Sequence, residues 1–169
     1  MKVFDGLHLA WFRRQQEREI RRRGWSGVYV GDYRSAPSWA YTIGLDETLD
    51  HPELVAFDLP RSSASELFAR SFEAIRTGTM VIEDGLQAPF TETRCVWRKV
   101  HPDHVAEWLT LACMRRFART GMRVGLEAFQ FVLSDAEGRL PWEAGYDQRL
   151  RSLQPTLWAP PGASPRGAT

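Results

Sequence analysis

Three short apolar runs in the first third of the chain constrain its fold most strongly. They span residues 25–30, 39–45 and 54–59, and each is bounded by turn-forming residues. Runs of this length that are rich in β-branched and aromatic residues are typical of strands. The first two runs flank residues 31–37, a segment of Gly, Asp, Ser and Pro that is typical of a loop. The sequence therefore predicts a hairpin and an antiparallel start to a sheet.

Three segments carry the signals of helices. Residues 7–23 contain neither Pro nor Gly and are rich in Arg, Gln and Glu, which favours a basic N-terminal helix. The sequence SASE at 63–66 matches a capping box, and Gly78 is a suitable terminator for the helix that would follow it. A third helix is expected to begin at Pro102 and to end at Gly121.

Three more segments have the composition of strands, namely residues 80–82, 91–100 and 127–133. Together the elements predict an α+β fold with a mainly antiparallel sheet and about three helices. We expect residues 1–154 to form a single domain that begins with the basic helix. Residues 155–169 are dominated by Pro, Gly, Ala and Ser, so we expect them to form a flexible tail.

The composition is that of a globular protein. The chain has 169 residues, of which 43% are hydrophobic and 12% aromatic, and this is enough for a packed core. No stretch approaches the roughly 20 apolar residues of a membrane span, and the N-terminus lacks the apolar region of a signal peptide. We therefore expect a cytoplasmic protein without a membrane segment, with Cys95 and Cys113 as free thiols.

The charges are distributed unevenly although their sum is only +1. Residues 1–34 carry eight basic and four acidic side chains, whereas residues 35–92 carry three and ten. This pattern fits either an electrostatic surface for a partner or two segments that neutralise each other, and we favour the second interpretation. Glu17 and Glu19 interrupt the Arg-rich segment 13–23, so a solvated face is favoured there over a nucleic-acid site.

The sequence lacks the strong motifs of common enzymes. There is no G-x-S-x-G, no phosphate-binding G-x-x-x-x-G-K, no H-E-x-x-H and no C-x-x-C. His101 and His104 have the spacing of two metal ligands on one helix face, but the sequence around Pro102 also fits an ordinary helix start. We favour the helix start and predict no metal site. The motifs identify no cofactor.

The stretch WAYTIGL, followed six residues later by HPEL, is the most distinctive part of the chain. Tyr41 and Thr42 would point to opposite faces of a strand, and Gly44 would allow another backbone or a ligand to approach closely. His51 and Glu53 could form an acid–base pair. The alternative is a central strand with a tight end, which spacing alone favours. We take all five as candidate ligand-binding residues.

Trp142 is the sixth candidate. It follows Gly138 and Pro141, and its ring could stack on a planar ligand together with that of Tyr146. The alternative is that Trp142 closes one end of the core, which is the more frequent use of a large aromatic side chain.

Taken together, WAYTIGL, HPEL, the sequence GRLPW at 138–142 and the closing Gln154-Pro155 resemble a bacterial family known as domain of unknown function 4262. The likeness extends from about Gly24 to Pro155. It implies a compact cytoplasmic protein but brings no established activity, cofactor or catalytic residue. One departure is that Leu133-Ser134 precedes Asp135 where the family leads us to expect Trp-Pro.

These features support two classes of function. The first is a binding module for a small molecule or a protein partner, in which the segment 41–53 and Trp142 border the site. The second is an enzyme, either of the flavin-binding split-barrel type, which the order of elements in 25–78 resembles, or one that uses His51 and Glu53 for proton transfer. Binding of nucleic acid through residues 13–23 is a weaker third hypothesis.

Overall fold

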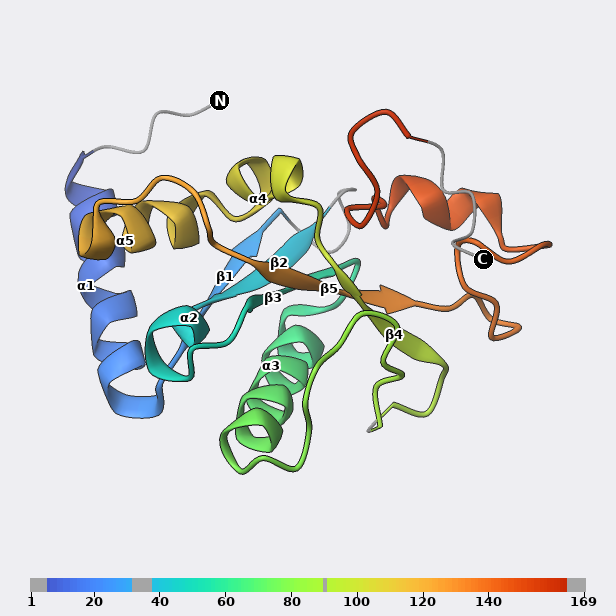
Figure 1. The fold of residues 1–169 in the computed structure, drawn as a ribbon, viewed down its shortest axis with the longest axis horizontal. Helices are drawn as coiled ribbons and strands as arrows, with labels where there is room; N and C mark the ends of the chain where they lie inside the picture. Colours follow the sequence, from blue (N-terminus) through green and yellow to red (C-terminus); the bar gives the residue numbers. More distant parts are fainter. Residues whose placement is uncertain (1–5, 32–37, 90, 164–169) are drawn as a thin grey trace.

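The protein is built around one five-stranded sheet (Figure 1). The computed structural model describes residues 6–31, 38–89 and 91–163. The strands are β1 (Ser26–Val30), β2 (Trp39–Ile43), β3 (Glu53–Phe57), β4 (Cys95–Lys99) and β5 (Ala128–Leu133), in the spatial order β1-β2-β3-β5-β4. The last strand of the chain therefore lies inside the sheet, between β3 and β4.

The sheet is mixed but mostly antiparallel. The predicted β1–β2 hairpin is antiparallel, and so are the β2–β3 pair and the β4–β5 pair, which agrees with the mainly antiparallel sheet that the sequence predicts. The β3–β5 pair is parallel, with Glu53 opposite Ala128. A parallel neighbour requires a long connection, and here it contains three helices and β4.

Helices are more numerous than the sequence predicts. The described residues contain α1 (Gly6–Arg23), α2 (Leu45–Thr48), α3 (Arg61–Arg76), α4 (Pro102–Trp108) and α5 (Thr110–Thr120), and a 3₁₀ helix over Gln148–Ser152. The predicted third helix is divided in two at Leu109, which is fully buried and has φ −118° and ψ 40°. Helix α3 begins after Pro60, so the sequence SASE lies within its first turns and does not cap it.

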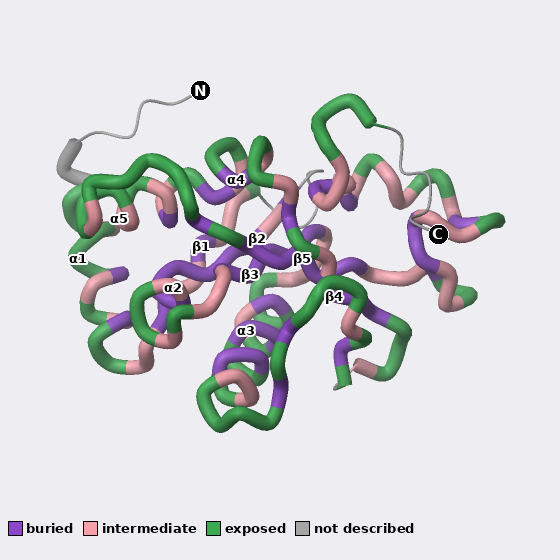
Figure 2. Tube along the Cα trace, in the orientation of Figure 1, coloured by how far each residue is buried: buried purple, intermediate pink, exposed green. Residues whose placement is uncertain are grey.

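The helices cover both faces of the sheet (Figure 1). Helix α3 packs on one face, where Phe68 and Trp97 are fully buried. Helices α1, α4 and α5 cover the other face, where Phe57 and Leu109 are fully buried. Figure 2 shows that buried residues follow the strands, whereas exposed residues follow the outer sides of the helices. The architecture is an α+β fold with two cores that share one sheet.

Residues 80–82 form no strand. Met80 and Ile82 are buried in the core on the α3 face, which explains the alternating pattern of this segment without strand pairing. The next residues lie along the outer edge of β4, where Gly85 N donates to Trp97 O and Trp97 N donates to Leu86 O, each at 2.8 Å. This edge of the sheet is therefore covered.

The first part of the predicted flexible tail is held against the sheet. The side-chain amide of Gln130 donates to Pro155 O at 2.7 Å and accepts from Leu157 N at 3.0 Å, and Leu157 is almost fully buried. Composition does not reveal such an anchor, because it depends on a glutamine from a distant strand. Residues 164–169 of the predicted tail lie outside the described residues. No helix in the described ranges is long and apolar enough to cross a membrane.

Candidate functional site

Strand β2 ends in a tight turn at Gly44. This residue has φ 113°, a left-handed conformation that glycine adopts without strain. A β-carbon at Gly44 would lie 3.1 Å from Gly24 O and 3.1 Å from Ile20 Cγ1. The structure thus places the end of α1 against Gly44, so the close approach allowed by glycine is that of another part of the same chain.

Glu53 has a buried carboxyl group whose hydrogen-bond donors among the described residues are all neutral. Its exposed fraction is 2%. Thr42 Oγ1 donates to Oε2 at 2.6 Å, and the backbone nitrogens of Gly44 and Asp46 donate to Oε1 at 2.8 and 3.4 Å. Burial raises the pKa of Glu53, and the hydrogen bonds to its carboxyl group oppose this effect without overcoming it. The carboxyl group therefore holds together the end of β2, the start of α2 and β3.

His51 does not join Glu53 in an acid–base pair. Its Nδ1 lies 2.7 Å from Pro52 O, and its ring lies 6.3 Å from that of Phe129, on the α3 side of the sheet. The Glu53 carboxyl group faces the other side, and no hydrogen bond links it to His51 within the described ranges. Burial lowers the pKa of His51, which favours its neutral form.

Tyr41 supports the beginning of α5. Its hydroxyl oxygen accepts a hydrogen bond from Leu111 N at 3.4 Å, and the side chain is 3% exposed. Burial raises the pKa of Tyr41 to about 12, so the phenol is neutral at physiological pH. Tyr41 of β2 thus supports the start of α5, and Glu53 of β3 supports the start of α2.

A cluster of ion pairs connects α2 to α5 and α1. We call it the α2–α5 charge cluster, and it comprises Glu17, Asp46, Glu47, Arg115, Arg116 and Arg119. Asp46 pairs with Arg116 and Arg119, while Arg115 Nε lies 2.8 Å from Glu47 Oε2. Arg115 also reaches Glu17 on α1, with 2.7 Å between Nη1 and Oε2. One arginine therefore bridges all three helices.

A groove of about 230 Å³ lies between α1 and α5. It is lined by Arg13, Gln16, Glu17, Leu111, Met114, Arg115 and Ala118. Leu111, Met114 and Ala118 recur at the spacing of one helix face and give the groove an apolar wall. Arg115 also belongs to the α2–α5 charge cluster, which fixes the position of this wall. We take this α1–α5 groove as the candidate functional site.

Gln16 is the most unusual residue in the groove. It is 6% exposed, and its buried amide nitrogen has no hydrogen-bond partner within the described part of the chain. Most buried side-chain polar atoms have a partner, and an unsatisfied one costs about 1–3 kcal/mol. A bound group that accepts a hydrogen bond would remove this cost.

Exposed apolar side chains occur on the two helices that form the groove and on the segment after α5. Six large apolar residues are exposed in the described ranges: Trp11, Val81, Met114, Phe117, Met122 and Val124. All except Val81 lie on α1 or in residues 114–124, which form α5 and the segment after it. Exposed apolar side chains that gather in one region are typical of interaction surfaces.

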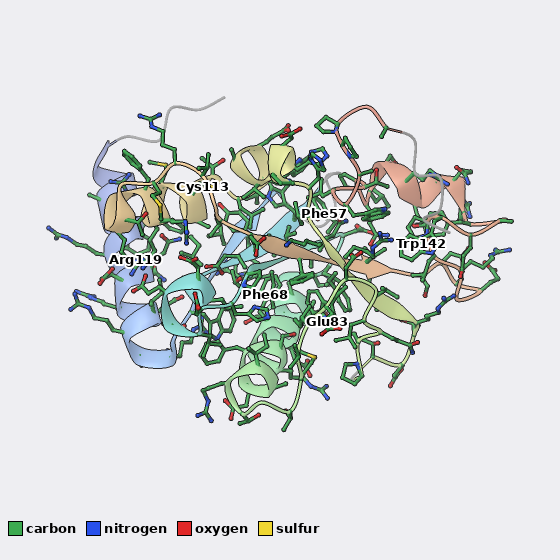
Figure 3. All side chains as sticks on the ribbon, in the orientation of Figure 1. Phe57, Phe68, Glu83, Cys113, Arg119 and Trp142 are labelled. Atoms are coloured by element: carbon green, nitrogen blue, oxygen red, sulfur yellow. The ribbon has the colours of Figure 1, made fainter. Side chains whose placement is uncertain are left out.

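Trp142 lies far from the groove. Figure 3 shows it and Arg119 of α5 at opposite ends of the molecule. The Trp142 ring packs edge-on against Trp158 at 5.4 Å, and the guanidinium of Arg98 lies 4.9 Å from its centre. The structure therefore does not bring Trp142 together with Tyr41, and its ring is engaged by other side chains of this chain.

The histidines and cysteines form no metal centre in the described ranges, where no group of three potential ligands lies together. His104 Nε2 lies 2.9 Å from Ala159 O, and His101 caps the start of α4. Cys95 is buried and Cys113 is half-buried, and both are free thiols.

Sequence reasoning identified the residues that support the groove but missed those that line it. The signal for the apolar wall was present in the helical spacing of Leu111, Met114 and Ala118. The sequence predicts one helix from Pro102 to Gly121, and an unbroken helix places a different face toward the core than the separate helix α5 does. Gln16 gave no signal, since a glutamine in a polar helix is expected to be solvated.

The fold and the groove define an α+β protein with an open mixed sheet and a candidate binding site between two helices. The family model described as Domain of unknown function (DUF4262) matches residues 19–147, and the chain belongs to this family. The match includes the whole sheet and α5 but not Gln16. The chain matches no curated protein and no solved structure.

Proposed function

We propose that this chain is a binding protein that holds a segment of a polypeptide partner in the α1–α5 groove. The observation that carries the proposal is Gln16, which lines the groove and whose buried amide nitrogen has no hydrogen-bond partner among the described residues. A glutamine amide both donates and accepts hydrogen bonds, so it is complementary to a peptide group.

The dimensions of the groove favour a polypeptide over a small molecule. Pockets for small ligands usually have volumes of roughly 300–1,000 Å³ and enclose most of the ligand. This groove is smaller, at about 230 Å³, and Met114 in its apolar wall is exposed. One or two side chains of a partner would fill it and cover this wall.

The WAYTIGL and HPEL residues have a supporting role in this proposal. Tyr41 holds the first turn of α5, and Thr42, Gly44 and Glu53 hold α2. Helix α2 in turn positions Arg115 through Glu47. The distinctive motifs would thus keep the wall of the groove in place without contacting the partner.

The observations give the enzyme hypotheses less support. Glu53 is sealed from solvent and hydrogen-bonded to three donors, so it lacks the access that proton transfer to a substrate requires. The sheet is open, with β1 and β4 at its edges, so it adds nothing to the resemblance to a split barrel.

The proposal can be tested with peptides selected from a random display library on the purified protein. Binding of a fluorescent selected peptide would be measured by anisotropy. We expect Met114→Glu to weaken binding at least about tenfold, since a charge would enter the apolar wall. Gln16→Leu should also weaken it, because the partner's peptide group would lose its hydrogen bonds.

Val81→Glu is the matched control, because Val81 is the exposed apolar residue remote from the groove. It should bind the peptide like the wild type. Equal binding by wild type, Met114→Glu and Gln16→Leu would overturn the proposal, provided that all variants retain the wild-type circular dichroism spectrum and melt no earlier than the wild type.

A further inference from the structure

Helix α1 carries a row of arginines without acidic partners. Arg13, Arg14, Arg18 and Arg22 are exposed and form no ion pair within the described residues, and we call them the arginine ridge. By contrast, Arg21 and Arg23 pair with glutamates of the same helix. The ridge therefore presents positive charge that the fold itself leaves uncompensated.

The arginine ridge is continuous with the α1–α5 groove. A shallow hollow on α1 is lined by Arg13, Arg14, Glu17, Arg18 and Arg21. Two of these residues, Arg13 and Glu17, also line the groove. A partner segment that fills the groove would therefore have the ridge directly beside it.

The position of the ridge beside the groove bears on the charge of the partner, and this inference rests on the proposed function. We infer that the partner segment is acidic and amphipathic, with apolar side chains against Leu111 and Met114 and carboxylates against the arginine ridge. Guanidinium groups bind carboxylates through two parallel hydrogen bonds. Arg14 and Arg18 are one helical turn apart, so acidic residues with similar spacing could reach both.

The same arginines fit a nucleic acid less well. The adjacent groove has an apolar wall formed by Leu111, Met114 and Ala118, which suits apolar side chains better than a phosphate backbone. The chain as a whole has a net charge of only +1, whereas domains that bind nucleic acid usually carry a strong basic excess.

The test uses three synthetic peptides that share the apolar residues of one peptide selected on the protein. Their remaining positions carry Glu and Asp, Gln and Asn, or Lys. We expect the acidic peptide to bind about tenfold more tightly than the neutral one, because two or three ion pairs add to the apolar contacts. This advantage should decrease with salt, since exposed charges are screened.

The variant Arg14→Gln/Arg18→Gln should abolish the advantage of the acidic peptide while leaving binding of the neutral peptide unchanged. The control Arg94→Gln/Arg149→Gln removes the same charge from exposed arginines far along the chain and should preserve the advantage. Comparison of these two double variants separates a local effect of the arginine ridge from a general effect of net charge.

Each outcome has a distinct meaning. Equal binding of acidic and neutral peptides would overturn the inference while leaving the proposed function intact. No binding of any of the three peptides would overturn both. Tighter binding of a single-stranded oligonucleotide than of the acidic peptide, lost in Arg14→Gln/Arg18→Gln, would replace the acidic partner with a nucleic acid.

Discussion

The hydroxyl group of Thr42 donates a hydrogen bond to Glu53 Oε2 at 2.6 Å and accepts one from Leu54 N at 2.8 Å. A single side chain thus satisfies both a buried carboxyl group and a backbone nitrogen of the neighbouring strand. Because Gly44 N donates to the other carboxyl oxygen, the end of β2 and the start of α2 and β3 form one hydrogen-bonded unit. This unit carries the acidic residues that hold α5.

The hydroxyl of Thr42 is therefore expected to contribute to stability. Thr42→Val keeps the shape of the side chain but leaves Leu54 N without an acceptor and removes a donor from Glu53. We expect the free energy of unfolding to fall by about 1–3 kcal/mol, as measured by urea denaturation. Thr42→Ser retains the hydroxyl, so its free energy of unfolding should fall by less than that of Thr42→Val. A Thr42→Val protein as stable as the wild type would show that these hydrogen bonds contribute little.

Glu53 should make stability depend on pH. Burial raises its pKa in the folded state, so the folded protein holds the proton more tightly than the unfolded chain does. The contribution of Glu53 is therefore fully present below its unfolded pKa and is lost as pH rises through its raised folded pKa. Glu53→Gln cannot titrate. In urea denaturation, the free energy of unfolding of Glu53→Gln minus that of the wild type should therefore increase as the pH rises above the unfolded pKa of Glu53.

Glu66→Gln provides the control for this pH dependence, because Glu66 is exposed on α3 and its change should leave the pH profile of stability close to that of the wild type. Parallel profiles for wild type and Glu53→Gln would refute the assignment of the pH dependence to Glu53.

The turn at Gly44 should tolerate substitution less well than other glycine turns. Gly44 and Gly78 both have positive φ, but a β-carbon at Gly78 would meet nothing within 4 Å. Gly78→Ala should cost about 1–2 kcal/mol for the left-handed backbone alone. Gly44→Ala adds contacts at 3.1 Å with Gly24 O and Ile20 to this cost. The Gly44→Ala protein should therefore have a lower melting temperature than the Gly78→Ala protein. Equal melting temperatures would mean that α1 can move away from the turn.

The local elements could be predicted from sequence because their signals are local. The hairpin of β1 and β2 follows from two apolar runs around a turn-rich segment, and Gly78 and Gly121 mark helix ends. The position of β5 could not be predicted in this way. Its pairing with β3 brings Glu53 opposite Ala128 across more than seventy residues of chain, and no local pattern specifies that contact.

The candidate site was predictable only in part for a similar reason. Thr42, Gly44 and Glu53 lie close together in sequence, so their spacing drew attention to the turn that they form. The groove instead combines Gln16 with Met114, which lie on two helices far apart in the chain. Whether a polar side chain on a helix is solvated or buried depends on the helix packed against it, and that information is absent from the helix's own sequence.

The α2–α5 charge cluster should stabilise α5, which forms the apolar wall of the groove, against local opening. Asp46 pairs with Arg116 and Arg119, and the side chains of Asp46 and Arg116 are both less than one-fifth exposed. Asp46→Asn should lower the free energy of local opening of α5 by about 1 kcal/mol, which would be seen as roughly fivefold faster hydrogen exchange in residues 110–120.

Glu73→Gln is the control for this exchange experiment, because Glu73 forms an exposed ion pair within α3. It should leave exchange in α5 unchanged. If Asp46→Asn also weakens binding of a selected peptide, although Asp46 does not line the groove, then α2 acts on the site through the position of α5. Unchanged exchange in α5 with weakened binding would contradict that order of cause and effect, because the loss of affinity would then have to arise without any loosening of the helix.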